Sequence, residues 1–298
     1  MIRIIKRFIR FLIELIFAIG IIGVIFYIMN EHYQVLDWFT VIKSNENKEE
    51  TFVNQVREAM LNGEDKITLK YVGKAHDMDW FTDDVINLVY NIDDPATSDD
   101  FDYLKFKTES IYSRVSGYGN LLTVEYEFIY NETPIETNKV NDKINDLMKQ
   151  WKIEKLSDYE KIKKIHDYII QNASYDTNLI NYSAYDNLIN QKSTCQGYIS
   201  LAYKMYTEAN IPCRIISGTG EGENHGWNIV SLNNKWYNID ITWDDPLVIN
   251  GEDMLLYEYF LKSDKDFPGH ERDTEYKTDQ FVSQYKISTK SYNIDESN

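Results

Sequence analysis

The chain has 298 residues, of which 43% are hydrophobic and 14% aromatic, enough to bury a sizeable core in about two domains. It carries 31 Lys and Arg against 48 Asp and Glu, and this net charge of −17 argues against nucleic-acid binding, which needs a basic face. Its two cysteines exclude a disulfide scaffold and a four-cysteine zinc ribbon.

The first thirty residues predict a membrane anchor. An apolar run over residues 11–29, interrupted by Glu14, follows four basic residues, Arg3, Lys6, Arg7 and Arg10. The run approaches the roughly 20 residues that span the hydrocarbon layer of a bilayer. It is longer than the apolar part of a cleaved signal peptide and has no small-residue cleavage site, so we expect an uncleaved, single-pass anchor.

The charges that flank this run predict its orientation. Basic residues precede it, whereas residues 31–42 contain no Lys or Arg. Because positive residues stay on the cytoplasmic side, we expect the N-terminus in the cytoplasm and the bulk of the chain outside it, at the cell membrane. Residues 1–43 are therefore assigned to the basic end, the anchor and a juxtamembrane segment.

Residues 44–152 predict a small α+β domain of unknown role. After a polar linker over 44–50, the apolar spacing predicts helices over 51–61, 79–90 and 136–151 and strands over 66–72, 103–115 and 121–130. Gly117, Tyr118, Gly119 and Asn120 favour a hairpin between the last two strands. We see no chemistry here, and we interpret His76 as a surface residue.

Residues 153–298 predict a second α+β domain with a polar C-terminal tail. Ser157 and Glu160 form a capping box at the start of a helix. Further helices are expected over 185–190 and from Cys195 to about residue 209, separated by a turn over 191–194. Strands are expected over 213–217, 224–231 and 235–241, with a flexible loop over 218–223. Asn233 and Asn234 suit a tight hairpin turn, because Asn tolerates positive φ.

Cys195 is the candidate nucleophile of this domain. It follows Ser193 and Thr194, which favour the N-cap position, at the start of a helix. Unpaired backbone N–H groups and the helix dipole stabilise an anion there, so we expect the reactive thiolate form to be favoured.

The hairpin places His225 and Asp240 on one face of the sheet. If Asn233 and Asn234 form a two-residue loop, residue 227 pairs with residue 240, and Asp240 becomes the diagonal neighbour of His225. A loop one residue different would put them on opposite faces. The three side chains then predict a nucleophile, a base that carries the proton and a carboxylate that orients the base.

Three blocks of sequence resemble the transglutaminase-like (papain-like cysteine) superfamily: Thr-Cys-Gln-Gly-Tyr over 194–198, His-Gly-Trp-Asn-Ile-Val over 225–230, and Trp-Tyr-Asn-Ile-Asp-Ile-Thr-Trp-Asp-Asp-Pro over 236–246. Shorter matches at 175–176, 184–185 and 259–264 fit its bacterial, membrane-anchored branch. The resemblance covers roughly residues 155–272. It implies a cysteine helix packed on an antiparallel sheet, with Cys195, His225 and Asp240 as nucleophile, base and orienter. The family includes cross-linkers, deamidases, peptidases and members with no known activity.

Other interpretations of the cysteines remain open. Cys213 is interpreted as a small hydrophobe in a buried strand. A disulfide between Cys195 and Cys213 would block the nucleophile. A metal site on Cys195, His225 and Asp240 has no fourth ligand and no zinc-like spacing, so neither a metal nor a cofactor is expected.

Two further features are interpreted as structural. His166 is expected to be a partly packed helix residue. Residues 243–246, Trp-Asp-Asp-Pro, are interpreted as a structural turn rather than a calcium loop, with Trp243 near the site.

We therefore expect a membrane-anchored, extracytoplasmic thiol enzyme that performs acyl transfer or hydrolysis on peptide or glutamine amide bonds. Its substrate would be a protein or peptide, and nucleic acid is not expected as a partner. The alternative is a non-catalytic binding module of the same fold at the cell surface. Cross-linking, deamidation and proteolysis all remain open, as does the oligomeric state.

Overall fold

The computed structural model describes residues 2–33, 48–72, 79–91, 101–118, 121–245 and 255–293. The chain separates into two compact units that interleave along the sequence. The first unit holds residues 1–56, 66–86 and 113–126, and the second holds residues 57–65, 87–112 and 127–298. The second unit includes residues 127–152, which the sequence analysis assigned to the preceding domain.

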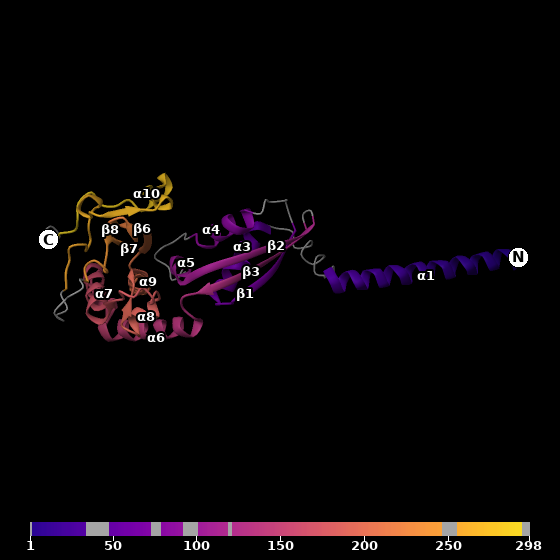
Figure 1. Ribbon diagram of the computed structural model, residues 1–298, viewed down its shortest axis with the longest axis horizontal. Helices are drawn as coiled ribbons and strands as arrows, with labels where there is room; N and C mark the ends of the chain where they lie inside the picture. Colours follow the sequence, from indigo (N-terminus) through magenta and orange to yellow (C-terminus); the bar gives the residue numbers. More distant parts are fainter. Residues whose placement is uncertain are drawn as a thin grey trace. The chain divides into compact units, whose positions relative to one another are not determined.

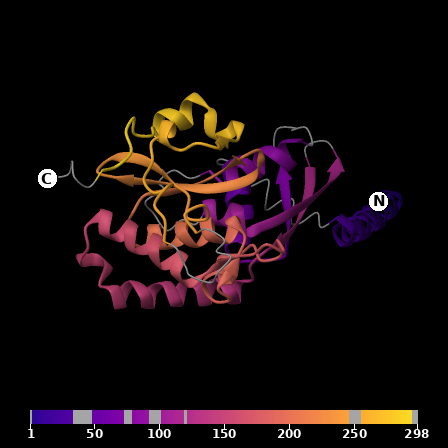
Figure 2. The ribbon, with the colours of Figure 1, turned by 60° about the vertical axis from the view of Figure 1, so that its left-hand side comes forward.

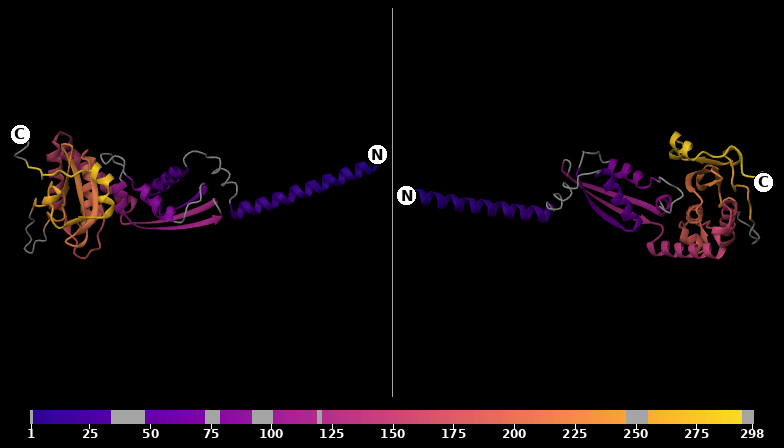
Figure 3. Two further views of the ribbon diagram at one scale, coloured as in Figure 1. Left: turned by 90° about the horizontal axis from the view of Figure 1, so that it is seen from above. Right: turned by 180° about the vertical axis from the view of Figure 1, so that it is seen from behind.

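Helix α1 (Ile2–Tyr33) is a single unbroken helix of 32 residues (Figure 3). Among the side chains that the structure describes, no helix has the length and apolar character needed to cross a membrane. The anchor over residues 11–29 stays a prediction from the sequence. Glu14 lies outside the described side chains.

The first unit is built around aromatic rings. Helix α3 (Lys48–Leu61) and the π-helical turn η1 (Trp80–Asp84), which leads into α4 (Val85–Val89), accompany a sheet of order β1 (Lys66–Val72), β3 (Leu121–Tyr130) and β2 (Thr108–Tyr118) (Figure 1). Phe52 lies 5.6 Å from the ring of Tyr71, and Trp80 lies 4.8 Å from the ring of Phe81. The expected helices over 51–61 and 79–90 and the strands over 66–72 and 121–130 are confirmed. Residues 44–47, His76 and residues 119–120 lie outside the described residues.

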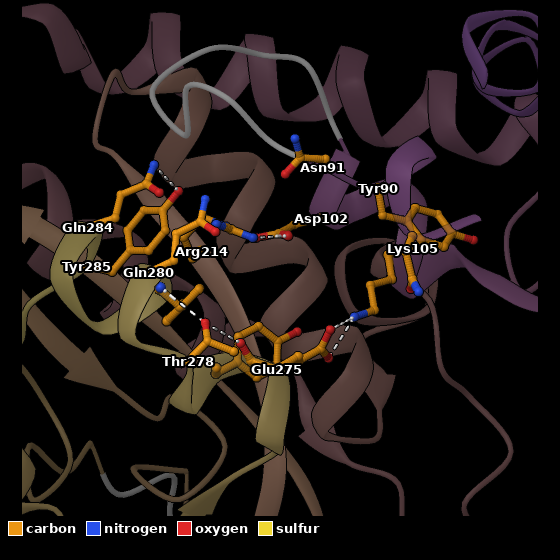
Figure 4. A pocket seen from close by; sticks show the side chains of 13 residues that line it. Tyr90, Asn91, Asp102, Lys105, Arg214, Glu275, Thr278, Gln280, Gln284 and Tyr285 are labelled. Atoms are coloured by element: carbon orange, nitrogen blue, oxygen red, sulfur yellow. Dashed lines mark hydrogen bonds and ion pairs between the residues drawn. The ribbon is translucent and has the colours of Figure 1, made fainter. Parts of the chain in front are cut away.

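The strand expected over 103–115 is wrong at its beginning, because residues 103–107 belong to helix α5 (Phe101–Lys107). Asp102 in this helix is 2% exposed and accepts hydrogen bonds from Arg214 Nε at 2.6 Å and from the Ile215 N–H at 3.0 Å. Lys105 pairs with Glu275 at 2.8 Å (Figure 4). These contacts with distant residues fix the helix, so they override the alternation that predicts a strand.

Arg214, Asp102, Lys105 and Glu275 line a cavity of about 350 Å³ (Figure 4). Its charged side chains are paired with each other, since the Arg214 guanidinium binds Asp102 and Lys105 binds Glu275. The ring of Tyr285 also packs 4.8 Å from the Arg214 guanidinium. These ion pairs therefore join α5 to strand β6 (Cys213–Gly220) and to η4 (Thr274–Lys277).

The second unit packs helices on an antiparallel sheet. The helices are α6 (Pro134–Trp151), α7 (Asp158–Asn172), α8 (Ala184–Leu188) and α9 (Cys195–Glu208), with the short 3-10 turn η2 (Ile153–Lys155). The sheet order is β8 (Lys235–Ile239), β7 (Glu223–Leu232), β6 (Cys213–Gly220) and β9 (His270–Arg272). Figure 2 shows the helices on one side of the strands and α10 (Asp279–Gln284) on the other.

Each face of this sheet has its own apolar cluster. The helical face buries Ile162, Ile165, Ile169, Tyr198, Leu201, Met205, Ile215, Val230 and Ile239. The opposite face buries Ile216, Trp227, Ile229, Phe267, Tyr276, Tyr285 and Ile287. Since side chains alternate along a strand, each central strand contributes to both clusters. The predicted cysteine helix therefore packs on an antiparallel sheet, as expected.

Several local predictions are confirmed. The Ser157–Glu160 capping box opens α7, and Thr133 and Glu136 form a second one at α6. Asn233 and Asn234 have φ of 52° and 59° and join β7 to β8 by a two-residue turn. The observed pair Asn228 and Ile239 has the register that this turn predicts.

Two expectations are wrong. Residues 218–223 do not form a flexible loop, because β6 and β7 pair up to Gly220 and Glu223 and leave a two-residue turn. Residues 192–193 form strand β5 (Lys192–Ser193), parallel to β4 (Ser174–Tyr175), rather than part of a turn. The partner of β5 lies in a distant segment, so the residues of the predicted turn carry no local signal of this pairing. Further along the chain, the 3-10 turn η3 (Asp264–Asp266) precedes β9, which pairs with β6.

Candidate active site

Cys195 is the first residue of α9 and is half-buried. Thr194 occupies the N-cap position, but its side chain makes no capping hydrogen bond, and its buried hydroxyl has no partner among the described residues. The expected side-chain cap is therefore absent. The first helical turn still leaves the backbone N–H groups of Cys195 and Gln196 without acceptors inside the helix.

Gly197 allows the helix to begin close to its neighbours. A Cβ atom at this position would lie 2.4 Å from Ser193 Oγ and 2.7 Å from the carbonyl oxygen of Ser183. Both distances are shorter than any real contact of a Cβ atom, so only glycine fits here. The glycine in the Thr-Cys-Gln-Gly-Tyr block therefore has a packing role beside the thiol.

Asp176 organises the segment that leads to Cys195, a role that sequence reasoning missed. The buried Asp176 carboxylate accepts hydrogen bonds from the N–H groups of Asn178 at 3.1 Å, Ile180 at 3.1 Å and Asn181 at 3.2 Å. The carbonyl oxygen of Asn181 in turn accepts one from the N–H of Thr194 at 2.8 Å. The only sequence signal was the Tyr-Asp pair at 175–176.

His225 lies on β7, and its side chain is 8% exposed. Its Nε2 lies 2.6 Å from Asp240 Oδ2, and Trp243 stacks on the ring with centroids 5.2 Å apart. Burial lowers the pKa of His225, but hydrogen bonds with Asp240 and Cys195 outweigh burial and raise the pKa to about 10. His225 is therefore protonated at neutral pH. The structure brings together the three side chains predicted for the site, Cys195, His225 and Asp240.

Asp240 directly follows β8 and is fully buried. Its Oδ1 accepts hydrogen bonds from the N–H groups of Thr242 at 3.0 Å and Trp243 at 3.1 Å. Burial raises the pKa of Asp240, but hydrogen bonds from His225 and His270 outweigh burial and keep the pKa below its usual value. Asp240 is therefore ionised at neutral pH.

His270 is the residue of the site that sequence reasoning missed. Its Nε2 lies 2.9 Å from Asp240 Oδ2, the same oxygen that His225 meets. His270 stands in a charged segment without apolar periodicity, so no local pattern distinguishes it. Only the pairing of β9 with β6 brings it to the site.

The spacing of these atoms bears on metal binding. His225, Asp240 and His270 each offer one ligand atom, and the three atoms lie within 4.8 Å of one another. Both imidazole nitrogens approach one carboxylate oxygen, at 2.6 and 2.9 Å. Ligand atoms around a tetrahedral zinc, with bonds of about 2.0 Å, lie roughly 3.3 Å apart. The shorter observed distances are those of hydrogen bonds, so we assign no metal ligands here.

Cys213 and Trp243 lie where the sequence predicts them. Cys213 is fully buried, as predicted, and both cysteines are free thiols, so they form no disulfide. Trp243 lies beside His225, as expected, and Pro246 lies outside the described residues.

His166 is more deeply buried than predicted, with no exposed side-chain surface. Its Nδ1 lies 3.1 Å from Asp167 Oδ1 and its Nε2 lies 3.1 Å from Asp244 Oδ2. Asp245 receives a hydrogen bond from the hydroxyl of Tyr198. The two carboxylates of the Trp-Asp-Asp-Pro segment are therefore occupied by structural contacts.

Comparison with curated proteins finds two distant relatives. Human kyphoscoliosis peptidase is 36% identical over 87 residues, which is 24% of this chain and 13% of that protein. The mouse kyphoscoliosis peptidase is 32% identical over 81 residues, covering 23% of this chain and 12% of that protein. The chain thus spans about an eighth of the length of these relatives.

Two solved structures also show similarity. A crystal structure of a TGase is 18% identical with a TM-score of 0.34, covering 70% of this chain and 59% of that chain. A putative cysteine protease from Cytophaga hutchinsonii is 15% identical with a TM-score of 0.31, covering 64% and 78%.

Comparison with protein families places a match in the second unit. Residues 146–241 match the family described as the transglutaminase-like superfamily. The matched segment contains Cys195, His225 and Asp240 and ends before His270. This part of the chain is therefore similar to transglutaminase-like superfamily domains.

Proposed function

We propose that this chain performs thiol-dependent acyl transfer or hydrolysis on peptide or glutamine amide bonds. Cys195 is the nucleophile, His225 the acid and base, and Asp240 the group that orients the imidazole. The observation that carries the proposal is the position of the His225 ring, which lies 2.6 Å from Asp240 Oδ2 and also contacts Cys195. The match to the transglutaminase-like superfamily supports the same chemistry.

The reaction follows from this geometry. The Cys195 thiolate attacks the amide carbonyl carbon, and the N–H groups at the start of α9 face the developing oxyanion. The carbon–nitrogen bond breaks as His225 donates its proton to the leaving nitrogen, which leaves an acyl thioester on Cys195. Water or an amine then attacks the thioester and gives its proton to His225. The thiolate leaves, and the enzyme returns to its starting state.

Alkylation by iodoacetamide tests whether the thiol is activated. We expect Cys195 to react at least about tenfold faster in the wild-type protein than in His225→Ala, because the imidazolium stabilises the thiolate. Cys213 is an internal control, since burial raises the pKa of its thiol and shields it until the protein unfolds. Equal rates at Cys195 in the two proteins would contradict the proposal.

Mass spectrometry of the trapped acyl adduct tests the chemical step. A peptide substrate should leave its acyl group on Cys195 in the wild-type protein and leave none in Cys195→Ser. A binding module is the alternative function. It predicts no adduct in either protein and an unchanged phenotype when Cys195 is replaced by serine.

The cellular location is a separate proposal that rests on sequence alone. We propose that the bulk of the chain lies outside the cytoplasm, because four basic residues precede the apolar run over 11–29. Protease added to intact cells should then digest the domain over 153–298, whereas protection until the cells are lysed would contradict this location.

A further inference from the structure

We propose that His270 is a positioning residue of this site, which donates a second hydrogen bond to Asp240 and holds that carboxylate in line with His225. The inference rests on the proposed function of Cys195, His225 and Asp240. It adds a fourth side chain that lies outside the segment matching the transglutaminase-like superfamily.

Two glycines bring His270 to the site. β9 pairs with β6 so that His270 lies opposite Gly220 and Arg272 lies opposite Gly218. A Cβ atom on Gly218 would lie 2.0 Å from the carbonyl oxygen of Glu271, so a side chain there would prevent this pairing. A Cβ atom on Gly220 would lie 3.0 Å from the ring of His225. Because neither glycine has a side chain, β9 can pair with β6 and the ring of His225 can lie close to Gly220.

The hydrogen bonds of His270 determine where its protons are. Nδ1 lies 3.0 Å from the carbonyl oxygen of Pro268, which can only accept a hydrogen bond. Nε2 lies 2.9 Å from Oδ2 of Asp240, which is ionised and therefore also only accepts. Since Oδ2 can only accept, the Nε2–H of His270 is the donor in this contact. His270 thus faces Asp240 as a hydrogen-bond donor.

Aromatic rings surround the imidazole of His270. Phe267 stacks on His270 with centroids 3.9 Å apart, and Trp243 lies at 4.2 Å. Trp227 lies at 4.9 Å and Tyr259 at 5.5 Å. These rings exclude water, and the His270 side chain is only 2% exposed. The pocket therefore fixes the position of the imidazole ring.

Other charged groups near His270 are paired among themselves. The titratable groups around it are His225, Asp240 and Tyr259 in the site, Glu221 at the β6–β7 turn, and Asp264, Glu271, Arg272, Tyr276 and Lys277 along the adjoining cavity. Arg272 lies 3.3 Å from Asp264, and Lys277 lies 2.8 Å from Glu271. Asp240 is therefore the carboxylate that His270 contacts directly.

Four donors now hold the Asp240 carboxylate. The N–H groups of Thr242 and Trp243 meet Oδ1, and His225 and His270 meet Oδ2. A carboxylate held at both oxygens cannot rotate away from His225, so the imidazole keeps its orientation toward Cys195.

The test compares two substitutions of His270. His270→Gln keeps an N–H donor, whereas His270→Leu removes it. The probe is iodoacetate, which is negatively charged. The imidazolium of His225 beside the thiolate attracts this anion, so the rate of carboxymethylation falls when His225 loses its proton. The rate of Cys195 carboxymethylation is measured between pH 5 and 11, with Cys213 protection as the measure of folding.

We expect His270→Leu to slow the reaction at neutral pH about tenfold, because a hydrogen bond to a charged group is lost. His270→Gln should recover most of that rate. His166→Gln is the matched control, because His166 bonds a different carboxylate, and it should leave the rate and profile unchanged.

Two outcomes would overturn the role of His270. One is wild-type rates and profiles in both His270 variants while the wild-type thiol remains faster than in His225→Ala. The other is a Gln variant as slow as the Leu variant. A wild-type thiol no faster than in His225→Ala would instead contradict the proposed function itself, so the two failures are distinguishable.

Discussion

The second unit contains two buried clusters of imidazole and carboxylate groups. The active cluster comprises His225, Asp240 and His270, and the scaffold cluster comprises His166, Asp167 and Asp244. Asp240 and Asp244 are four residues apart, and the N–H of Asp244 donates to the carbonyl oxygen of Asp240 at 3.2 Å.

The clusters differ in what their histidines contact. His225 lies between a carboxylate and the Cys195 thiol, whereas His166 lies between two carboxylates. Burial lowers the pKa of His166, but hydrogen bonds with Asp167 and Asp244 outweigh burial and raise the pKa. The same two chemical groups therefore prepare a reactive thiol in one place and join helix α7 to a loop in the other.

The loop is held from both sides in the scaffold cluster. Asp244 Oδ2 meets His166, and Asp244 Oδ1 accepts a hydrogen bond from the N–H of Tyr259 at 2.9 Å. Tyr259 packs against Trp243 in the active cluster with ring centroids 5.0 Å apart. The scaffold cluster thus supports the wall of the active cluster without taking part in its chemistry.

The largest expected effect comes from Asp240→Asn, which should lower the rate of acyl-adduct formation on the order of 10²- to 10⁴-fold. An amide cannot stabilise the imidazolium and favours the wrong tautomer of His225. Acyl-adduct formation on Cys195 is followed by mass spectrometry. Asp244→Asn is the control and should leave the rate per folded molecule within about twofold. Equal slowing in both variants would remove the distinction between the clusters.

The next effect is on stability and comes from His166→Leu. It should lower the free energy of unfolding by about 3 kcal/mol, because it leaves two carboxylates without their buried partner. Urea denaturation measures this change, and Cys195→Ser should stay within about 0.5 kcal/mol of the wild type. A His166→Leu protein as stable as the wild type would show that the scaffold cluster does not stabilise the fold.

The contribution of His166 to the free energy of unfolding depends on pH. The folded-state pKa of His166 is raised above its unfolded value of about 6.5. Its stabilising contribution is therefore fully present below about pH 6.5 and is lost as pH rises through the folded-state pKa. The stability difference between the wild type and His166→Leu should shrink over that rise. The stabilising contribution of His225, whose folded-state pKa is about 10, should likewise be lost between about pH 6.5 and 10.

The smallest effects come from the rings that cover each imidazole. Trp243→Phe should slow alkylation of Cys195 about two- to fivefold, because a smaller ring stacks less fully on His225. Tyr257→Phe keeps the ring that stacks on His166 but removes the hydroxyl that donates to Asp167 at 2.9 Å. It should leave alkylation unchanged and reduce the free energy of unfolding by about 0.5–1 kcal/mol. If iodoacetamide alkylated Cys195 more slowly in Tyr257→Phe than in the wild-type protein, this result would show that the two clusters are coupled.

Local patterns predicted much of the candidate site. The turn at Asn233 and Asn234 fixed the parity of β7 and β8, and that parity put His225 and Asp240 on one face. The start of α9 followed from the residues around Cys195. Long-range pairing was not predictable in this way: α5 is a helix because Asp102 binds Arg214, and β5 exists because Ser174 and Lys192 pair.

By itself, the sequence determined where the cysteine helix begins, which residues form the tight hairpin and how the imidazole and the first carboxylate align. Each depends on residues within a few positions of one another, where the extended N-cap conformation of Thr194, the positive φ of asparagine and the alternation of side chains act directly. Only the tertiary structure decided that His270 meets Asp240 and that His166 meets Asp244. Those contacts form when segments far apart in the chain pack together, and an isolated histidine carries no local pattern that says which carboxylate it will reach.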